Sequence, residues 1–338
     1  VLFGEGLKMS KVLVTGANGF LGSWVVRKLN ELGHEVSILA RPTSDLSELE
    51  GQNFQIHPGD VTNLESLVQA FQGQDCIFHL AGVIAYERSQ RELMEKVNVG
   101  GTRNVIDAIE KARVPKMVYL SSVVAIGGGL KEGQILNEDS PFNIHHLNLG
   151  YFETKHAAEQ LVRVACEQKR IDAVILNPST IYGPGDAKKG SRKTQLKVAQ
   201  GKFPFYTSGG VNVVDVEDCV NGIILAWKKG RTGERYILAG ENLTIRELFK
   251  IIADEAGVPA PKIKMPGWLL YTIGWIGDQM TKLGLKGSLS LENAHTAQMF
   301  HWFDNAKAKR ELGFTARPAK EAIKKSVNWI REKGLLEK

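Results

Sequence analysis

From Lys11 onward the chain repeats one pattern: a short β-branched segment, a turn, and a longer segment with helical periodicity. We expect strands over residues 11–15, 35–40, 54–57, 76–80, 116–120 and 173–177. Helical patterns, with apolar residues at steps of three and four, occupy residues 21–32, 64–71, 89–112 and 151–168. Strands separated by helices pair in parallel through right-handed crossovers, and the helices cover both faces of the sheet. The sequence therefore predicts an α/β fold with a doubly wound parallel sheet of the Rossmann type.

Shorter elements follow Pro184 and indicate a smaller second lobe. We expect a strand at 211–214, a helix at 217–228, a strand at 235–238, and a helix at 245–256 with Thr244 as its N-cap. Residues 9–180 are assigned to a dinucleotide-binding domain and residues 181–338 mainly to a mixed α/β substrate-binding lobe, with the chain re-crossing to the first sheet near 211–240. Residues 1–8 precede a plausible native start at Met9 and are expected to be a cloning remnant.

Composition excludes several classes of protein. Of the 338 residues, 43% are hydrophobic and 24% charged, which excludes a disordered chain, a collagen or a disulfide scaffold. Cys76, Cys166 and Cys219 form no C-x-x-C pair, so we expect buried apolar cysteines in a reducing, cytoplasmic compartment. The net charge of +6 is spread along the chain and gives no sign of nucleic acid or membrane as a dedicated partner. No run reaches about 18 apolar residues, so we expect no transmembrane span.

A glycine-rich turn joins the first expected strand to the first expected helix. Gly16 allows a tight turn, Gly19 allows the backbone to approach a pyrophosphate, and Gly22 allows the helix to pack closely on the sheet. The amino end of the helix, with Phe20 and Leu21, then faces the anion. This segment predicts a dinucleotide site.

Hydroxyl and amino groups follow later strands. Ser121 and Ser122 end the strand at 116–120, and Tyr151 and Lys155 lie four residues apart on one face of the next helix. A free phenol has a pKa of about 10, and a nearby cation favours its ionised form. We therefore expect Lys155 to lower the pKa of Tyr151 and to make it an acid–base group.

The histidines give no metal-binding pattern. His79 lies inside the apolar segment 76–80, which predicts a hydrogen-bonded core histidine. No two histidines stand with a carboxylate in an arrangement such as H-E-x-x-H, so we expect no metal.

The G-x-x-G-x-x-G spacing of TGANGFLG and the Tyr-x-x-x-Lys pair resemble the extended branch of the short-chain dehydrogenase/reductase superfamily, the NAD-dependent epimerase/dehydratase family. Residues 177–186 and 233–244 are similar to its dihydroflavonol-reductase-like and hopanoid-associated sugar epimerase-like members. The resemblance implies that Ser122 hydrogen-bonds the substrate oxygen, that Tyr151 transfers a proton, and that Lys155 also binds the nicotinamide ribose. It implies that Asn98 supports the active-site helix, and that helices 89–112 and 151–168 form a homodimer.

The resemblance also implies the cofactor contacts. Asp60 and Val61 would lie against the adenine, and the small residues after the fourth strand against the ribose and pyrophosphate. Arg41, directly after Ala40 at the end of the second strand, suits the 2′-phosphate of NADP(H). NAD(H) stays open as the alternative, with Asp45 as the nearby carboxylate. The remaining expected cofactor residues are Leu80, Ala81, Gly82 and Pro178.

Three functions stay open. We favour an NADP(H)-dependent oxidoreductase that interconverts a carbonyl compound and an alcohol; the alternatives are a sugar or nucleotide-sugar epimerase/dehydratase and a non-catalytic NADP-binding sensor. Val211 and Asp215 stand where nucleotide-sugar epimerases typically have Arg and His, which disfavours a diphosphate substrate. A basic cluster nearby could replace that arginine; its members are Lys188, Lys189, Arg192 and Lys193.

An apolar segment at 268–285 contains Trp268 and Trp275. We expect a helix packed on the second lobe; the alternatives are a lid over an apolar substrate and an interfacial surface for a lipid-like one.

Overall fold

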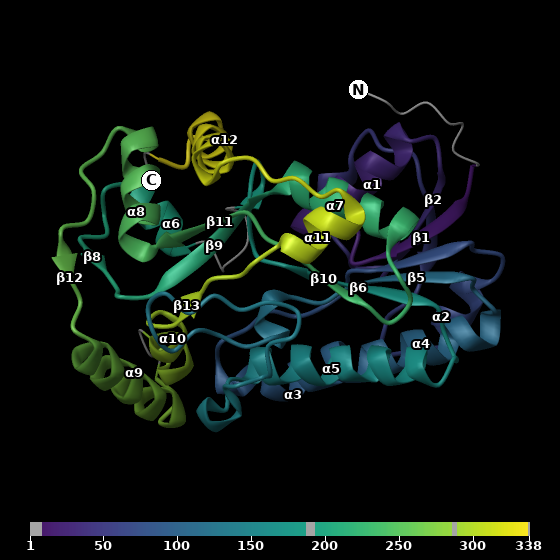
Figure 1. Cartoon of the computed structure of the whole chain (residues 1–338), viewed down its shortest axis with the longest axis horizontal. Helices are drawn as coiled ribbons and strands as arrows, with labels where there is room; N and C mark the ends of the chain where they lie inside the picture. The colour runs from purple at the N-terminus through teal and green to yellow at the C-terminus, as the bar shows by residue number, and fades with distance from the viewer. Residues whose placement is uncertain (1–8, 187–192, 286–288, 337–338) are drawn as a thin grey trace.

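A computed structural model describes residues 9–186, 193–285 and 289–336; the expectation for residues 1–8 lies outside the described residues. Seven parallel strands form the main sheet, in the order β10-β6-β5-β4-β1-β2-β3 (Figure 1). Their bounds are β1 (Lys11–Thr15), β2 (Glu35–Ala40), β3 (Gln55–Pro58), β4 (Cys76–His79), β5 (Lys116–Leu120), β6 (Ala173–Pro178) and β10 (Arg235–Leu238). The predicted α/β fold with a doubly wound parallel sheet is confirmed. The strand order reverses between β1 and β4, and in such sheets ligands bind outside that point.

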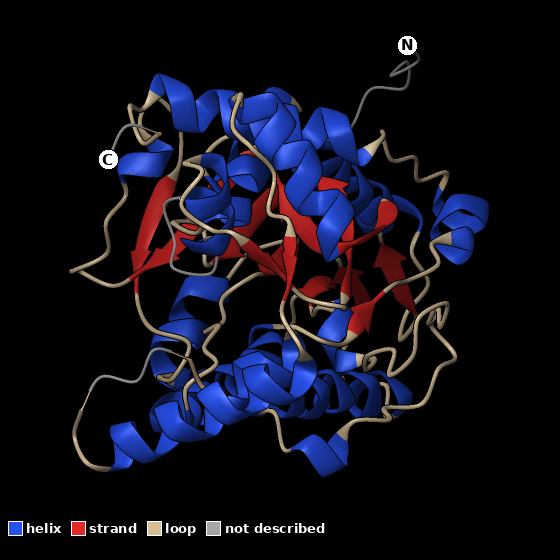
Figure 2. Ribbon diagram, turned by 90° about the vertical axis from the view of Figure 1, so that its left-hand side faces the viewer, coloured by secondary structure: helices blue, strands red, loops and turns tan. Residues whose placement is uncertain are grey.

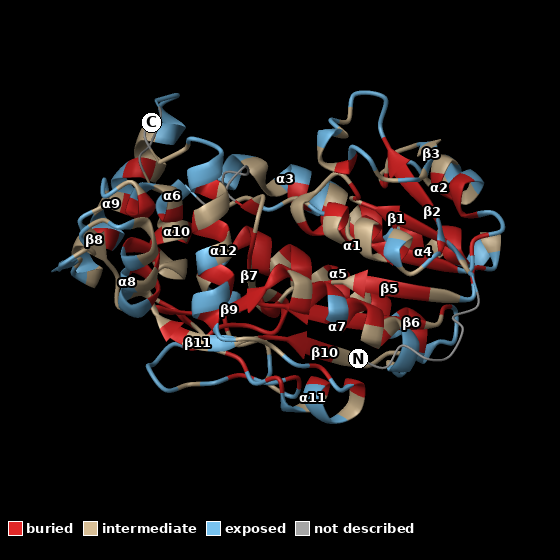
Figure 3. Ribbon diagram, turned by 90° about the horizontal axis from the view of Figure 1, so that it is seen from above, coloured by how far each residue is buried: buried red, intermediate tan, exposed pale blue. Residues whose placement is uncertain are grey.

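Helices cover both faces of the main sheet, which makes three layers (Figure 2). One face carries α2 (Leu64–Phe71), α4 (Gly101–Ala112) and α5 (Gly150–Glu167). The other carries α1 (Phe20–Glu31), α7 (Val216–Lys229) and α11 (Ala306–Leu312). Buried residues run along β1, β5 and β10, because both faces of these strands are covered (Figure 3).

A four-stranded mixed sheet organises the smaller lobe. Its strands are β7 (Thr180–Tyr182), β9 (Gly210–Asp215), β11 (Glu241–Thr244) and β13 (Phe300–His301). Its apolar core involves α6 (Lys193–Ala199), α8 (Ile245–Ala256) and α12 (Ala319–Glu332). Thr244 caps α8 as predicted, in a reciprocal capping box with Glu247. The strand pair β8 (Phe205–Tyr206) and β12 (Ile263–Lys264) and the helices α9 (Gly267–Lys282) and α10 (Leu291–Thr296) complete this lobe.

The expected single helix at 89–112 is wrong in detail. A short 3₁₀ turn, η2 (Arg88–Gln90), precedes α3 (Arg91–Met94), and a π-helical turn, η3 (Glu95–Gly100), separates α3 from α4. The spacing of apolar residues does not distinguish a π turn from an α-helix. The π turn occurs where the buried amide side chain of Asn98 is hydrogen-bonded to the backbone of Val83, in the segment after β4.

Buried polar and sulfur groups behave as the sequence predicts. Cys76, Cys166 and Cys219 are buried free thiols. His79 lies at the end of β4, with Nδ1 2.8 Å from Thr15 Oγ1 and Nε2 3.2 Å from Thr102 Oγ1. Burial lowers its pKa to about 3, and the positive charge of Lys155 contributes. His79 is therefore a neutral, hydrogen-bonded core histidine at neutral pH.

His79 makes stability depend on pH. The unfolded chain binds a proton on this residue below pH ~6.5 and the folded chain does not, so its contribution is present above that pH and is lost on acidification. Between pH 7.5 and 5.5 we expect His79 to lower the free energy of unfolding by about 1.4 kcal/mol. Urea titrations of the wild type and His79→Gln at both pH values measure this difference. An identical pH dependence in the two proteins would contradict it.

Candidate active site

The glycine turn lies directly against the chain that follows β4. Gly16 has a φ of +74°, and a Cβ built there would lie 2.7 Å from the amide nitrogen of Ala81 and 2.8 Å from the carbonyl carbon of Leu80. A Cβ on Gly22 would lie 2.1 Å from the carbonyl oxygen of Gly16. Any side chain at either position would collide with backbone, so both glycines are fixed by close packing.

The amino end of α1 is open toward this turn. Gly19 is its N-cap and supplies no side-chain cap, so the first amide groups of the helix, from Phe20 and Leu21 onward, lack that partner. The Phe20 ring lies against Gly185, with its Cδ2 3.5 Å from the position of a Cβ there, and Trp24 Nε1 donates to the carbonyl of Pro184 at 3.3 Å. The turn thus lies between the main sheet and the loop that follows β7. Free amide groups at a helix start are suited to an anion such as a pyrophosphate.

Arg41 and Asp60 meet beyond the ends of β2 and β3. Arg41 Nε lies 3.9 Å from Asp60 Oδ2, and the Arg41 side chain is 65% exposed. Asp60 Oδ1 accepts from the amide and the hydroxyl of Thr62, both at 2.8 Å, so this carboxylate also forms a turn. Asp45, the carboxylate named for the NAD(H) alternative, accepts from the amide of Ser47 at 3.0 Å. Val61 is buried, with its Cγ2 2.9 Å from the position of a Cβ on Gly101.

Ser122 and Tyr151 come together at the carboxyl end of β5. Ser122 caps the 3₁₀ turn η4 (Val123–Ala125), and Tyr151 lies in the first turn of α5. The Ser122 side chain lies near the Tyr151 phenol and favours its ionised form. The Tyr86 ring packs edge-on against the buried Tyr151 ring, with centroids 5.9 Å apart. The structure therefore joins the two hydroxyl groups that the sequence selected.

Lys155 lies beside the carboxyl ends of β4 and β5. Its Nζ donates to the carbonyl of Leu120 at 3.0 Å and lies 3.6 Å from the position of a Cβ on Gly82. The side chain is buried, and burial lowers its pKa to about 8, while the carboxylate of Glu159 opposes that shift.

The expected effect of Lys155 on Tyr151 is wrong for this structure. Burial raises the pKa of Tyr151 well above its ordinary value, the neighbouring Tyr86 adds to the rise, and the Ser122 side chain opposes it. Lys155 is not among the groups that shift this pKa, and its ammonium group donates to the carbonyl of Leu120. Tyr151 is therefore protonated at neutral pH and is suited to donate a proton.

Asn98 joins the π turn to α5. Its Oδ1 accepts from the amide of Val83 at 2.8 Å, and its Nδ2 donates to the carbonyl of Val83 at 3.0 Å and to Thr154 Oγ1 at 3.2 Å. A Cβ on Gly82 would lie 3.3 Å from Asn98 Oδ1. Asn98 thus fixes the chain after β4 against the helix that carries Tyr151 and Lys155.

Sequence reasoning missed Glu159, one helical turn beyond Lys155. This fully buried carboxylate accepts from Ser121 Oγ at 2.5 Å and from Asn177 Nδ2 at 2.7 Å, and pairs with Arg235 Nη1 at 3.1 Å. Asn177 Nδ2 also donates to the carbonyl of Ser122 at 2.9 Å. The network ties α5 to the ends of β5 and β6, where Pro178 follows, and to β10. The signal was an acidic residue on the buried face of α5, at the same four-residue step that relates Tyr151 and Lys155.

Val211 and Asp215, the two residues compared with the nucleotide-sugar epimerase pattern, both lie in β9. Val211 is buried in β9, and Asp215 caps α7 by accepting from the amide of Glu217 at 2.8 Å. Asp215 also lies 3.2 Å from Lys325 Nζ and 3.8 Å from Arg317 Nη1. Arg317 and Lys325 also pair with Glu217, and Arg317 with Asp218, so three carboxylates share two positive charges and the expected repulsion of a diphosphate is not removed. Lys188, Lys189 and Arg192 lie outside the described residues, and Lys193 begins α6.

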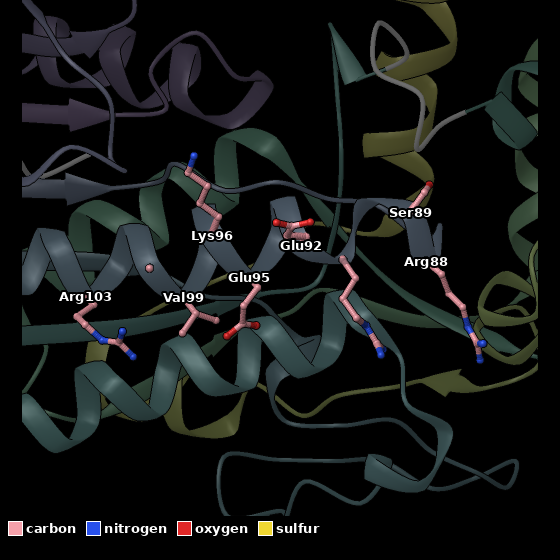
Figure 4. A pocket seen from close by; sticks show the side chains of 9 residues that line it. Arg88, Ser89, Glu92, Glu95, Lys96, Val99 and Arg103 are labelled. Carbon is pink, nitrogen blue, oxygen red and sulfur yellow. The ribbon is translucent and has the colours of Figure 1, made fainter.

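A hollow of about 900 Å³ is lined by residues of η2, α3, η3 and α4 (Figure 4), and neither Ser122 nor Tyr151 is among them. Charged side chains line it, with Arg88 and Arg103 at its two ends; the others are Arg91, Glu92, Glu95 and Lys96. Within the described ranges no three His, Cys, Asp or Glu side chains gather as a metal site would require. Within the same ranges no helix has the length and apolarity needed to cross a membrane.

Comparison with known proteins relates the whole chain to one family. The model of the "NAD dependent epimerase/dehydratase family" matches residues 12–239. A Synechocystis protein provisionally named dihydroflavonol 4-reductase is 34% identical, over 95% of this chain and 94% of its own length. Sterol demethylase protein B of Methylococcus capsulatus is 29% identical, over 96% of this chain and 99% of its own. The crystal structure of gox2253 matches with a TM-score of 0.86 at 36% identity, over 96% of this chain and 99% of that one.

The Glu159 network generates a stability prediction. Glu159→Gln leaves Arg235 without its buried counter-charge, so we expect the free energy of unfolding to fall by about 3–5 kcal/mol. Glu153→Gln is the matched control on the same helix, because Glu153 pairs with the exposed His145 and its loss should cost less than about 1 kcal/mol. Urea denaturation of both variants measures the difference. Equal losses of unfolding free energy in the two variants would show that the buried network contributes no more to stability than the exposed ion pair.

Proposed function

The chain belongs to the NAD dependent epimerase/dehydratase family, and from this we propose that it is an NADP(H)-dependent oxidoreductase that interconverts a ketone or aldehyde and an alcohol. The observation that carries the proposal is the gathering of Ser122, Tyr151 and Lys155 at the carboxyl end of β5. Ser122, Tyr151, Lys155 and Asn98 are the proposed catalytic group.

The described residues fit a dinucleotide. The turn at Gly16 and Gly22 leaves no room for side chains, and the start of α1 has no side-chain cap, so a pyrophosphate could approach the backbone there. We assign the pyrophosphate to the turn, the adenine end to Asp60 and Val61, and the nicotinamide end to Gly82, Lys155 and Pro178. The nicotinamide, when bound, supplies or accepts a hydride.

In reduction, Tyr151 Oη donates its proton to the carbonyl oxygen as that oxygen gains negative charge. Ser122 Oγ hydrogen-bonds the same oxygen and orients it. Lys155, with its pKa of about 8, is mostly protonated at neutral pH and holds positive charge near the ribose position. Asn98 acts through position, because it holds α5 against the chain after β4.

We propose an apolar substrate, held mainly by the second lobe. Tyr151 belongs to a cluster of apolar side chains that includes Ile144, Phe152 and Met299. Two relatives carry the names of a flavonoid reductase and a sterol demethylation protein, whose substrates are ring compounds. A nucleotide-sugar epimerase is the second candidate, because the family takes its name from epimerases and dehydratases. Net oxidation of NADPH with hydrophobic ketones supports the reductase; interconversion of sugars without net oxidation supports the epimerase.

We further propose a cytoplasmic homodimer. Buried free thiols suit a reducing compartment. The charged hollow lined by α3 and η3 lies on the helices expected to form the subunit contact, where its arginines and glutamates could pair with those of a second copy.

Tyr151→Phe tests the proton donor. The variant keeps the ring and loses the hydroxyl, so we expect turnover of NADPH with a carbonyl substrate to fall by about 10²–10⁴-fold while NADPH binding stays unchanged. Tyr206→Phe in β8 is the control, because it removes a phenol hydroxyl outside the proposed catalytic group. Full turnover by Tyr151→Phe would remove this residue as the acid. A wild type that binds NADPH and turns over no substrate would support the sensor.

Arg41→Ala tests the cofactor preference. Loss of a charge-assisted hydrogen bond to a phosphate costs about 1.5–3 kcal/mol, so we expect NADPH binding to weaken about 10–100-fold and NADH binding hardly at all. Arg310→Ala is the matched control, because that side chain is 67% exposed on α11, against 65% for Arg41. Equal weakening of both cofactors by Arg41→Ala would refute the 2′-phosphate contact.

A further inference from the structure

Helix α9 is fixed to the molecule by one narrow face. It lies at the lower left in Figure 1 and packs on α10. Its buried residues are Leu270, Gly274 and Gly277. A Cβ on Gly277 would lie 1.9 Å from the carbonyl oxygen of Leu289, and one on Gly274 would lie 3.0 Å from Leu291 Cα. The glycines therefore allow α9 to pack closely on the segment before α10.

The opposite face of α9 is apolar and open. Trp268 is 70% exposed and Trp275, two turns later, is 57% exposed; Tyr271 lies between them on the same side. Ile276 is also exposed, and the face continues past the end of the helix with Leu283 and Leu285. A contiguous group of exposed apolar side chains marks a binding surface, whereas single exposed apolar residues need no explanation. We call this set the α9 face.

The segments that flank α9 in the sequence are basic. Exposed lysines lie before the helix, at Lys262 and Lys264, and at its end, at Lys282. None of the three forms an ion pair with another described residue. The single acidic residue between 258 and 285 is Asp278, which accepts from the amide of Leu291. Tryptophan and lysine around an apolar stripe are the combination that favours the headgroup region of an anionic membrane.

The α9 face is connected to the candidate active site through α10. Glu292 of α10 accepts from the amide of Gly150 at 3.1 Å, at the start of α5. Ser290 donates to the carbonyl of Tyr86 at 2.7 Å, and the Tyr86 ring packs on Tyr151. The helix that carries the exposed tryptophans therefore packs on a segment that contacts residues next to Tyr151.

We propose that the α9 face binds the surface of an anionic lipid bilayer, with the helix in the plane of the interface and the lysines against the headgroups. Membrane binding would bring the candidate active site close to the lipid phase, where water-insoluble compounds are concentrated. The inference stands on the exposed residues and their charges, and it does not depend on the proposed reaction.

Vesicle sedimentation with the whole chain tests the proposal. We expect the wild type to sediment with vesicles of equal parts phosphatidylcholine and phosphatidylglycerol, less with phosphatidylcholine alone, and less at high salt. Trp268→Ser with Trp275→Ser should lower the partition coefficient at least about tenfold, because two interfacial apolar contacts are lost. The triple change Lys262→Gln, Lys264→Gln and Lys282→Gln should remove the preference for phosphatidylglycerol.

The matched control changes exposed apolar residues outside α9: Leu130→Ser with Ile135→Ser, of which Ile135 is 55% exposed. This variant should bind vesicles as the wild type does, and circular dichroism confirms that each variant is folded. Absence of wild-type binding, or equal binding by the tryptophan variant, would overturn the proposal. A fall in oligomer size of the tryptophan variant without vesicles, measured by sedimentation velocity, would also overturn it and identify the face as a subunit contact.

Discussion

The ion pair of Glu159 with Arg235 is the interaction on which the candidate site depends. A buried carboxylate is tolerated only where opposite charge and hydrogen bonds replace water, and this one has a guanidinium, a hydroxyl and an amide around it. Those partners lie in β6, in β10 and directly after β5. The requirement to satisfy one charge therefore fixes α5 relative to the strand ends, and with it the position of every functional group on that helix.

Two further contacts hold α5 from its other side. Asn98 links Thr154 to the chain after β4, and Glu292 receives the first amide group of the helix from Gly150. Tyr151 lies between these polar attachments, within apolar surroundings that exclude water and keep its phenol protonated. Lys155 is buried as well, but the charge of Glu159 prevents burial from neutralising it. Positioning and charge control thus come from the same few side chains.

Local patterns predicted much of this arrangement, and contacts between distant segments account for what they missed. The strands, the glycine turn and the Tyr151–Lys155 spacing are properties of short segments, so the sequence contains them directly. A step of four residues places two side chains on one side of a helix, but it does not say that Lys155 binds the carbonyl of Leu120 rather than the phenol. The contact of Asp215 with Lys325 joins residues more than a hundred positions apart in the sequence. The spacing of apolar residues does not reveal the π turn at Asn98, because the distinctive contact there is a hydrogen bond between the Asn98 side chain and the backbone of Val83.

That π turn also decides what a deletion would change. It holds one residue more than an α-helical turn would, so deleting one residue between 95 and 100 would restore ordinary helical winding. The turns on either side would keep nearly the same register, because the wide turn had absorbed the extra residue, and the apolar stripe of α4 would stay against the core. The side chains within the turn would be redistributed around the helix axis, and Asn98 would lose its place beside Val83 and Thr154. The extra residue therefore serves the placement of one amide side chain, and the packing of α4 does not require it.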